Sequence, residues 1–222
     1  MEVKICGLTR PEDVAHGAAA GAHYLGFVFF PPSPRSLDLE AGRALMAAVP
    51  AGVARVALLV DAADDLLDQV AALPVDILQL HGEETPERVA EVKSRTGLTV
   101  MKAVGIRESA DLPQIARYGA VADRLLIDAK PPKGATRPGG NAIAFDWRLI
   151  AGRDWPCPWL LAGGLTPHNV AEAVGLTAAP GLDVSSGVEA APGLKDPAKV
   201  EAFIKAANAA APQPIPGAAL AE

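Results

Sequence analysis

The chain has 222 residues and a formal net charge of −6 at pH 7. An acidic chain lacks the basic surface that would bind nucleic acid or an anionic membrane, so we expect neither partner. Half of the residues are hydrophobic, which is enough for a sizeable buried core.

The two cysteines, Cys6 and Cys157, are too few for a disulfide framework in a chain of this length. The opening residues MEVKICGLTR lack the charged and apolar regions of a signal peptide. No run reaches the roughly 18 apolar residues of a membrane span. We therefore expect a cytoplasmic protein in which both thiols stay reduced.

Short apolar runs alternate with helical patterns along the whole chain. The runs are nearly continuous, which is typical of strands covered on both faces of a parallel sheet. They occupy residues 3–8, 24–30, 55–60, 76–82, 99–106, 124–129, 159–165 and 181–188. Helical spacing is found in residues 38–48, 64–72, 87–95, 111–118, 145–151, 168–175 and 197–209.

Cap residues followed by proline mark four helix starts. Thr9, Pro11 and Glu12 match a capping box. The other three starts pair a cap residue with proline at the first helical position, and they are Thr85-Pro86, Thr166-Pro167 and Asp196-Pro197.

Eight strand–helix units predict a single α/β domain, a (β/α)8 TIM barrel over residues 1–210. The alternative is an open doubly wound sheet, which usually carries a glycine-rich fingerprint after its first strand; Gly7-Leu8-Thr9 is not one. Residues 211–222 are rich in Pro and Ala, and we expect a disordered tail there. The loop Lys130–Asn141, rich in Pro and Gly, is either a solvated surface loop or a lid over an anionic ligand.

In a TIM barrel the chemistry lies at the carboxyl ends of the strands. Strand side chains alternate with a period of two. The pairs that share a face are therefore Lys4 and Cys6, Gln79 and His81, and Asp183 and Ser185. If these faces point to the barrel axis, polar groups from separate strands meet at one mouth.

Two loops suggest a phosphate site. Gly163-Gly164 end the seventh predicted strand, and Ser185-Ser186 follow one strand later. Glycines let backbone N–H groups approach an anion, and barrels commonly bind phosphate between the loops after strands seven and eight. The alternative is a tight turn without a ligand.

Two residues are candidates for proton transfer. Cys6 ends the first strand next to Lys4, whose charge can tune the pKa of the thiol; otherwise it is a small buried hydrophobic residue. Asp128 ends an apolar run, where a carboxyl could stay protonated as a general acid; otherwise it closes a loop. Cys157, between two prolines, is expected to be structural.

Other polar residues near the strand ends have less defined roles. The planar fork of Arg35 suits a carboxylate, although a solvated surface arginine is the alternative. His81 either orients a substrate or caps the fourth strand. The four histidines show no ligand-type spacing such as HxxxH, so we expect no metal.

Taken together, these motifs resemble the phosphoribosylanthranilate isomerase family of tryptophan biosynthesis. The resemblance covers about residues 2–208, and KICG at the start with DVSSGVE near the end makes it specific. The matching stretches are Lys4-Ile-Cys-Gly7, Gly26-Phe-Val-Phe29, Ser33-Pro-Arg35, Gln79-Leu-His-Gly82, Leu161-Ala-Gly-Gly-Leu165 with Pro167 and Asn169-Val170, and Asp183-Val-Ser-Ser-Gly-Val-Glu189.

The resemblance implies an Amadori rearrangement of N-(5-phosphoribosyl)anthranilate to 1-(2-carboxyphenylamino)-1-deoxyribulose 5-phosphate. It implies Cys6 as the general base, Asp128 as the general acid and no cofactor. Arg35 matches the residue that holds the anthranilate carboxylate, with His81 and Asp183 as further substrate-binding candidates. Gly163, Gly164, Ser185 and Ser186 match a phosphate cradle. We expect a monomer or homodimer.

The sequence departs from the family in one stretch. Many members have a compact Gly-Gly-Thr-Gly after the acid, whereas here a longer loop contains Pro138-Gly-Gly-Asn141. Two alternatives remain. One is the related aminoaldose isomerase of histidine biosynthesis, which uses aspartates after strands one and five, where this chain has Cys6 and Val104-Gly105. The other is a non-catalytic phosphate-binding barrel.

Overall fold

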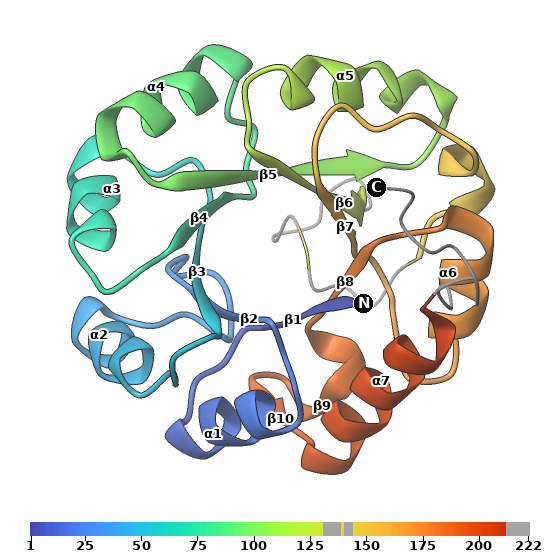
Figure 1. Ribbon diagram of the computed structural model, residues 1–222. Helices are drawn as coiled ribbons and strands as arrows, with labels where there is room; N and C mark the ends of the chain where they lie inside the picture. Colours follow the sequence, from blue (N-terminus) through green and yellow to red (C-terminus); the bar gives the residue numbers. More distant parts are fainter. Residues whose placement is uncertain (131–138, 140–143, 212–222) are drawn as a thin grey trace, which may run out of the picture.

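The computed structural model describes residues 1–130, 139 and 144–211 of the chain. Eight parallel strands form a closed barrel in sequence order, ringed by helices (Figure 1). The barrel closes where β8 pairs with β1, which places Lys4 opposite Asp183. The strands are β1 Glu2–Cys6, β2 Tyr24–Val28, β3 Ala54–Leu59, β4 Ile77–Leu80, β5 Thr99–Ile106, β6 Arg124–Ala129, β7 Trp159–Leu161 and β8 Gly181–Val184. The predicted (β/α)8 barrel is confirmed.

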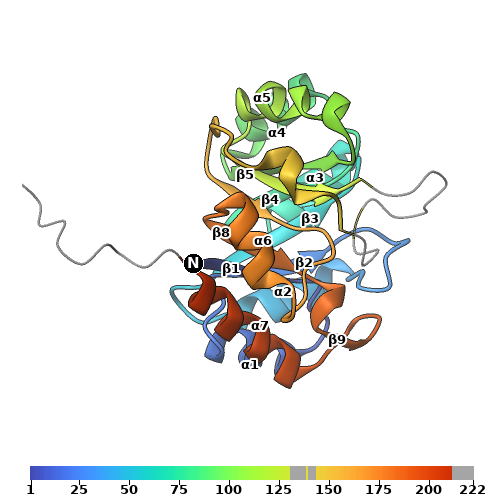
Figure 2. The ribbon, with the colours of Figure 1, turned by 90° about the vertical axis from the view of Figure 1, so that its right-hand side faces the viewer.

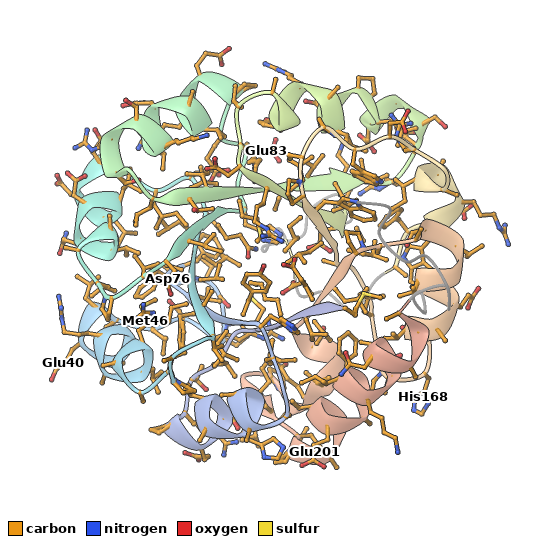
Figure 3. All side chains as sticks on the ribbon, in the orientation of Figure 1. Glu40, Met46, Asp76, Glu83, His168 and Glu201 are labelled. Carbon is orange, nitrogen blue, oxygen red and sulfur yellow. The ribbon has the colours of Figure 1, made fainter. Side chains whose placement is uncertain are left out.

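The helices bury one face against the strands and expose the other. On α2, Met46 lies on the inner side and is fully buried, while Glu40 lies on the outer rim (Figure 3). The α-helices are α1 Pro11–Ala19, α2 Leu39–Ala47, α3 Asp64–Ala71, α4 Pro86–Thr96, α5 Pro113–Gly119, α6 Val170–Thr177 and α7 Pro197–Ala210. Single 3₁₀ turns are η1 Ser109–Asp111, η2 Trp147–Ile150 and η3 Ser186–Val188, and an antiparallel pair, β9 Glu189–Ala191 and β10 Leu194–Lys195, follows β8.

Two of the four predicted helix caps are confirmed. The side chain of Thr85 accepts a hydrogen bond from the backbone N–H of Arg88 at the start of α4. Asp196 accepts from the N–H groups of Ala198 and Lys199 at the start of α7. Each satisfies backbone donors that the first helical turn leaves without partners.

The other two predicted caps are wrong, Thr9 because of a tertiary contact and Thr166 because of a local one. Thr9 donates its hydroxyl to the carbonyl of Gly193, and α1 begins after Arg10 without a side-chain cap. Thr166 lies before the helix start, and its N–H donates to Asn169 Oδ1. Helix α6 therefore begins at Val170 rather than at the predicted proline.

The predicted helix at residues 145–151 is also wrong, since the structure has only the 3₁₀ turn η2 there. Asp146 accepts from the N–H of Arg148, and Ala151 already has an extended conformation. Gly152, in the left-handed region with φ of +64°, then turns the chain away. The tight turn ends before a second helical turn can form.

The barrel interior is filled below the mouth by apolar side chains. One buried cluster lies inside the barrel, and its members are Tyr24, Val56, Ile77, Met101, Ala103, Leu126, Leu160 and Ala162. A separate small cluster of Cys6, Val28 and Leu58 lies next to the carboxyl ends of the strands. The interior is thus a packed core, and only its upper end can form a site.

The mouth of the barrel lies at the end opposite the N-terminus. Figure 2 shows the loop after β2 and the β9–β10 hairpin at that end. The loop 130–141, considered as a surface loop or a lid, is described only at Lys130 and Gly139, and the predicted tail only at Ala211. Within the described part of the chain, no helix combines the length and apolar character that crossing a membrane requires.

Candidate active site

A cavity with about 520 Å³ of empty space opens at the carboxyl ends of the strands. The described residues that line it are Cys6, Val28, Phe30, Ser33, Arg35, Leu58, Val60, Gln79, His81, Asp128, Gly139, Asp183 and Ser185. Apolar side chains therefore cover one part of the wall, and ionisable side chains from β1, β6, β8 and the loops after β2 and β4 cover the rest. Such a mixed wall is typical of a small-molecule site.

Cys6 lies beside a buried ion pair. The ammonium of Lys4 is 2.8 Å from Asp183 Oδ1, and Lys4 is fully buried. Burial raises the pKa of the Cys6 thiol, while the Lys4 ammonium acts in the opposite direction without outweighing it. The thiol is therefore mainly protonated at neutral pH, although the nearby ammonium groups of Lys4 and Lys195 favour its thiolate form.

The close approach of Lys4 and Cys6 depends on a glycine in the neighbouring strand. A Cβ at Gly26 would lie 2.9 Å from Cys6 Sγ and 3.1 Å from Lys4 Nζ. Any side chain there would push the thiol or the ammonium away. The glycine of β2 thus makes room for the charged surroundings of the thiol.

Asp128 is held by hydrogen bonds to an imidazole and a backbone N–H group on the other side of the cavity. Its Oδ1 accepts from the N–H of Ala129 at 2.7 Å, and its Oδ2 is 3.2 Å from His81 Nε2. The other ring nitrogen of His81 is 2.9 Å from the amide nitrogen of Gln79. A chain of three side chains therefore leads from the interior of β4 to the carboxyl group on β6.

Two glycines pack against this chain. A Cβ at Gly139 would lie 2.8 Å from His81 Nε2 and 3.0 Å from Asp128 Oδ2. A Cβ at Gly163 would lie 2.6 Å from the backbone nitrogen of Ala129 and 3.0 Å from Asp128 Oδ1, and Gly163 has a φ of +84°. Only glycine fits at position 163 without strain, so this end of the seventh strand shapes the surroundings of Asp128.

The segment after His81 is fixed by a second buried ion pair. The ammonium of Lys102 on β5 is 2.9 Å from Glu84 Oε2 and 2.7 Å from the carbonyl of Gly82. The Glu84 carboxylate also accepts from the N–H of Gly82. On the other side, the N–H of His81 donates to the carbonyl of Leu59 at 2.8 Å. The backbone of His81 is therefore held between β3 and β5.

Arg35 is 5% exposed, which rules out the solvated surface arginine considered as its alternative. Its Nε and Nη2 donate to the two carboxylate oxygens of Glu189, each at 2.7 Å. Lys195 adds a second cation, with its Nζ 2.8 Å from Glu189 Oε1. Burial alone would raise the pKa of Glu189, but the two cations outweigh it and lower that pKa. The Arg35 fork is thus already paired with a carboxylate of the protein, and Nη1 is not part of this pair.

Comparison with known proteins identifies the family. A family model described as N-(5'phosphoribosyl)anthranilate (PRA) isomerase matches residues 3–206. An N-(5'-phosphoribosyl)anthranilate isomerase of Cereibacter sphaeroides is 60% identical over 94% of this chain and 99% of the relative. The chain belongs to the N-(5'-phosphoribosyl)anthranilate isomerase family. It is therefore an isomerase, and the predicted resemblance is confirmed.

Solved structures agree with this family assignment. A phosphoribosyl anthranilate isomerase of Thermotoga maritima has a TM-score of 0.85 and 36% identity, covering 94% of this chain and 99% of its own. Another solved phosphoribosyl anthranilate isomerase, in complex with reduced 1-(o-carboxyphenylamino)-1-deoxyribulose 5-phosphate, has a TM-score of 0.80 and 34% identity, with the same coverage. A 3-hexulose-6-phosphate synthase, 16% identical with a TM-score of 0.65, shares the fold alone.

The structure of this family member brings most of the predicted site residues into one cavity. Those that line it are Cys6, Arg35, His81, Asp128, Asp183 and Ser185. Gly163, Gly164 and Ser186 are not among its lining residues. The two glycines have left-handed φ values of +84° and +66° just after β7, and Ser186 opens the turn η3 just after β8. They therefore lie next to the cavity rather than in its wall.

Sequence reasoning assigned no role to several residues in or near the candidate site. Glu189 belongs to a matching motif, but its partner Arg35 is 154 positions away. Lys195 carries no motif, and only the β9–β10 hairpin brings it to Glu189. Gly139 stands in the loop that was considered as a lid. For Gln79, the period-two pattern that pairs it with His81 was the available signal. Among the described residues, no group of three or more His, Cys, Asp or Glu could hold a metal ion.

Proposed function

We propose that this isomerase converts N-(5-phosphoribosyl)anthranilate into 1-(2-carboxyphenylamino)-1-deoxyribulose 5-phosphate, in the cytoplasm, as a step of tryptophan biosynthesis. The observation that carries the proposal is that a thiol and a carboxyl group, Cys6 and Asp128, line one cavity. They come from strands that are not neighbours in the barrel, so a bound sugar can lie between them. A proton-transfer isomerase needs a base and an acid in this arrangement.

In the proposed reaction, Asp128 gives its proton to the ring oxygen of the ribose. The bond between C1′ and the ring oxygen breaks, and the electron pair of the aniline nitrogen forms a Schiff base. Cys6, as a thiolate, then takes the proton from C2′, and the electrons return to the nitrogen to give an enolamine. Tautomerisation of the enolamine gives the ketone. The nitrogen of the substrate accepts the electrons, so the scheme uses no metal or cofactor.

The raised pKa of Cys6 fits a base that becomes active only when its surroundings change. The Lys4 ammonium stabilises the thiolate, and Lys195 contributes in the same direction. A thiolate in a site from which substrate has displaced water is a stronger base than one in bulk water. We therefore assign Lys4 to the support of the base and not to substrate contact.

Substrate binding is assigned to the polar wall of the cavity. Arg35, His81 and Asp183 are proposed to contact the anthranilate and ribose groups. Because Glu189 occupies the Arg35 fork, a substrate carboxylate would meet the remaining nitrogen Nη1. Gly163, Gly164, Ser185 and Ser186 are proposed to bind the phosphate through backbone N–H groups and hydroxyls, next to the positions where β7 and β8 end.

The test is a fluorescence assay with purified protein and N-(5-phosphoribosyl)anthranilate, whose fluorescence is lost on conversion. We expect turnover that depends on protein concentration. Turnover of the aminoaldose of histidine biosynthesis instead, with none of the anthranilate compound, would overturn the proposal. The site does not favour that second activity, for which aspartates are expected after strands one and five. Here β1 ends in Cys6, and β5 has Gly105 opposite Asp128 of β6.

The assembly is proposed to be a monomer or a homodimer. A solved phosphoribosylanthranilate isomerase of Thermotoga maritima, 35% identical with a TM-score of 0.80, is described as a dimeric protein from which monomers were generated. Cys6 and Asp128, the proposed base and acid, line one cavity of a single chain. The proposed chemistry therefore does not require a second subunit.

A further inference from the structure

Gln79 is a fully buried polar side chain that lines the cavity without an assigned role. Its amide nitrogen lies 2.9 Å from Nδ1 of His81, two residues further along. The opposite ring nitrogen, Nε2, lies 3.2 Å from Asp128 Oδ2. Gln79 thus reaches the proposed acid only through the imidazole ring.

The orientation of the Gln79 amide, with its nitrogen toward Nδ1, sets which ring nitrogen of His81 carries the proton. An amide nitrogen can only donate, so Nδ1 of His81 must accept and cannot carry a proton. In a neutral imidazole the proton is then on Nε2, which donates to Asp128 Oδ2. With Ala129 donating to Oδ1 at 2.7 Å, both oxygens of the carboxyl group accept a hydrogen bond.

The carbonyl oxygen of the Gln79 amide indicates that this residue does not serve the stability of the fold. In the described part of the structure, its carbonyl oxygen Oε1 is buried without a hydrogen-bond partner. A buried acceptor left in this way costs free energy that an apolar side chain of similar size would not. The contact of the amide nitrogen with His81 is the feature that an apolar residue could not supply.

We propose that Gln79 is a positioning residue, which holds His81 in the Nε2-protonated tautomer so that the ring donates a fixed hydrogen bond to Asp128. The inference rests on the proposed function, in which Asp128 is the acid. A fixed donor stabilises the carboxylate that remains after Asp128 has given its proton to the sugar. With the opposite tautomer, the lone pair of Nε2 would face the carboxylate and oppose that step.

The direct test is the tautomer of His81 in protein labelled with ¹⁵N-histidine, read from long-range ¹H–¹⁵N correlations near neutral pH. The chain has four histidines, and His81→Asn assigns the signal. We expect protonated Nε2 and unprotonated Nδ1 in the wild type. In Gln79→Glu a carboxylate replaces the donor, so Nδ1 should become protonated. An Nδ1-protonated wild type, or the same tautomer in both proteins, would overturn the inference.

Steady-state kinetics give the second readout. Gln79→Leu replaces the donor with an apolar side chain of similar size, so this variant should fold even if the charged variant Gln79→Glu does not. We expect kcat to fall about tenfold with little change in KM, as for the loss of one hydrogen bond to a charged group. A change confined to KM, or no change, would contradict a positioning role.

The matched control is Gln69→Leu. Gln69 is an exposed glutamine on α3 that donates to the carbonyl of Asp65. It does not line the cavity that contains His81. It should leave both the His81 spectrum and kcat unchanged. If the wild type shows no turnover, the proposed function fails while the tautomer still reports on Gln79. If it turns over but the tautomer is wrong, only the role of Gln79 fails.

Discussion

The two sides of the cavity surround their reactive groups in opposite ways. Around Cys6 the neighbours are full charges, since the Lys4 ammonium lies between the thiol and the carboxylate of Asp183. Around Asp128 the contacts come from an imidazole and a backbone N–H group. Each arrangement suits the proton transfer proposed for its group.

The difference follows from the charge that each group carries when it acts. A thiol that serves as a base must become an anion in a buried place, and a nearby cation lowers that cost. A carboxyl that serves as an acid must first keep its proton, and a lysine or arginine against it would favour the ionised form instead. Donors without a full charge stabilise the carboxylate after the proton has left, and they favour ionisation beforehand less strongly than a lysine or arginine would.

The largest effects are expected from removing the two groups themselves. Cys6→Ser and Asp128→Asn should each lower kcat by a factor on the order of 10² or more, the usual size of a general acid or base contribution. Substrate binding should survive in both. Cys157→Ser is the matched control for the thiol, since this cysteine does not line the cavity. Near-normal turnover in either site variant would remove that residue from the proposed mechanism.

The next largest effect is expected at Arg35, which is paired with Glu189 rather than with Cys6 or Asp128. Arg35→Ala should raise KM by roughly 10- to 100-fold with a smaller change in kcat, as for a lost charged hydrogen bond to the substrate. Glu189→Gln keeps Arg35 but weakens the pair that orients it, so its KM should rise less. Initial-rate measurements over a range of substrate concentrations check both. An unchanged KM in Arg35→Ala would show that the guanidinium serves only the fold.

The sharpest test of the charged side uses two variants with opposite expected effects on pH dependence. Without the ammonium, Lys4→Met should raise the pKa of Cys6 further. Activity at neutral pH should fall about tenfold, as for the loss of one charge-assisted interaction. The Asp183 carboxylate raises the thiol pKa, so Asp183→Asn should lower it. Because the thiolate is the proposed base, the rise of kcat/KM with pH should move to higher pH in the first variant and to lower pH in the second.

Alkylation of Cys6 by iodoacetamide, measured against pH in a Cys157→Ser background, reports the same thiol pKa without substrate. The matched control is Lys93→Met on α4, because it breaks a more exposed ion pair with Asp123, the residue before β6. It should leave the alkylation profile unchanged. Shifts in the same direction for Lys4→Met and Asp183→Asn would refute the electrostatic account of the thiol.

The strands could be predicted because their apolar pattern is a local property of the sequence. A strand covered on both faces must be apolar throughout, so runs such as residues 124–129 match β6 without any knowledge of their neighbours. Strands β7 and β8 are shorter than predicted. Gly163-Gly164 and Ser185-Ser186 lie after the strands end, although apolar residues continue on either side of them in the sequence. The helix predicted at residues 145–151 is absent, because its sequence pattern does not indicate that the 3₁₀ turn ends at Ile150.

For the site, the sequence by itself determined which reactive groups end the strands, because closing eight parallel strands brings those ends to one mouth. Cys6, His81, Asp128 and Asp183 were therefore found from the pattern and the motifs. Tertiary structure alone decided their partners: the Arg35 fork on Glu189, the ammonium of Lys195 beside it, and Gly139 against the His81–Asp128 contact. Such contacts join residues far apart in the chain, and they depend on how the loops return over the barrel, which no local pattern records.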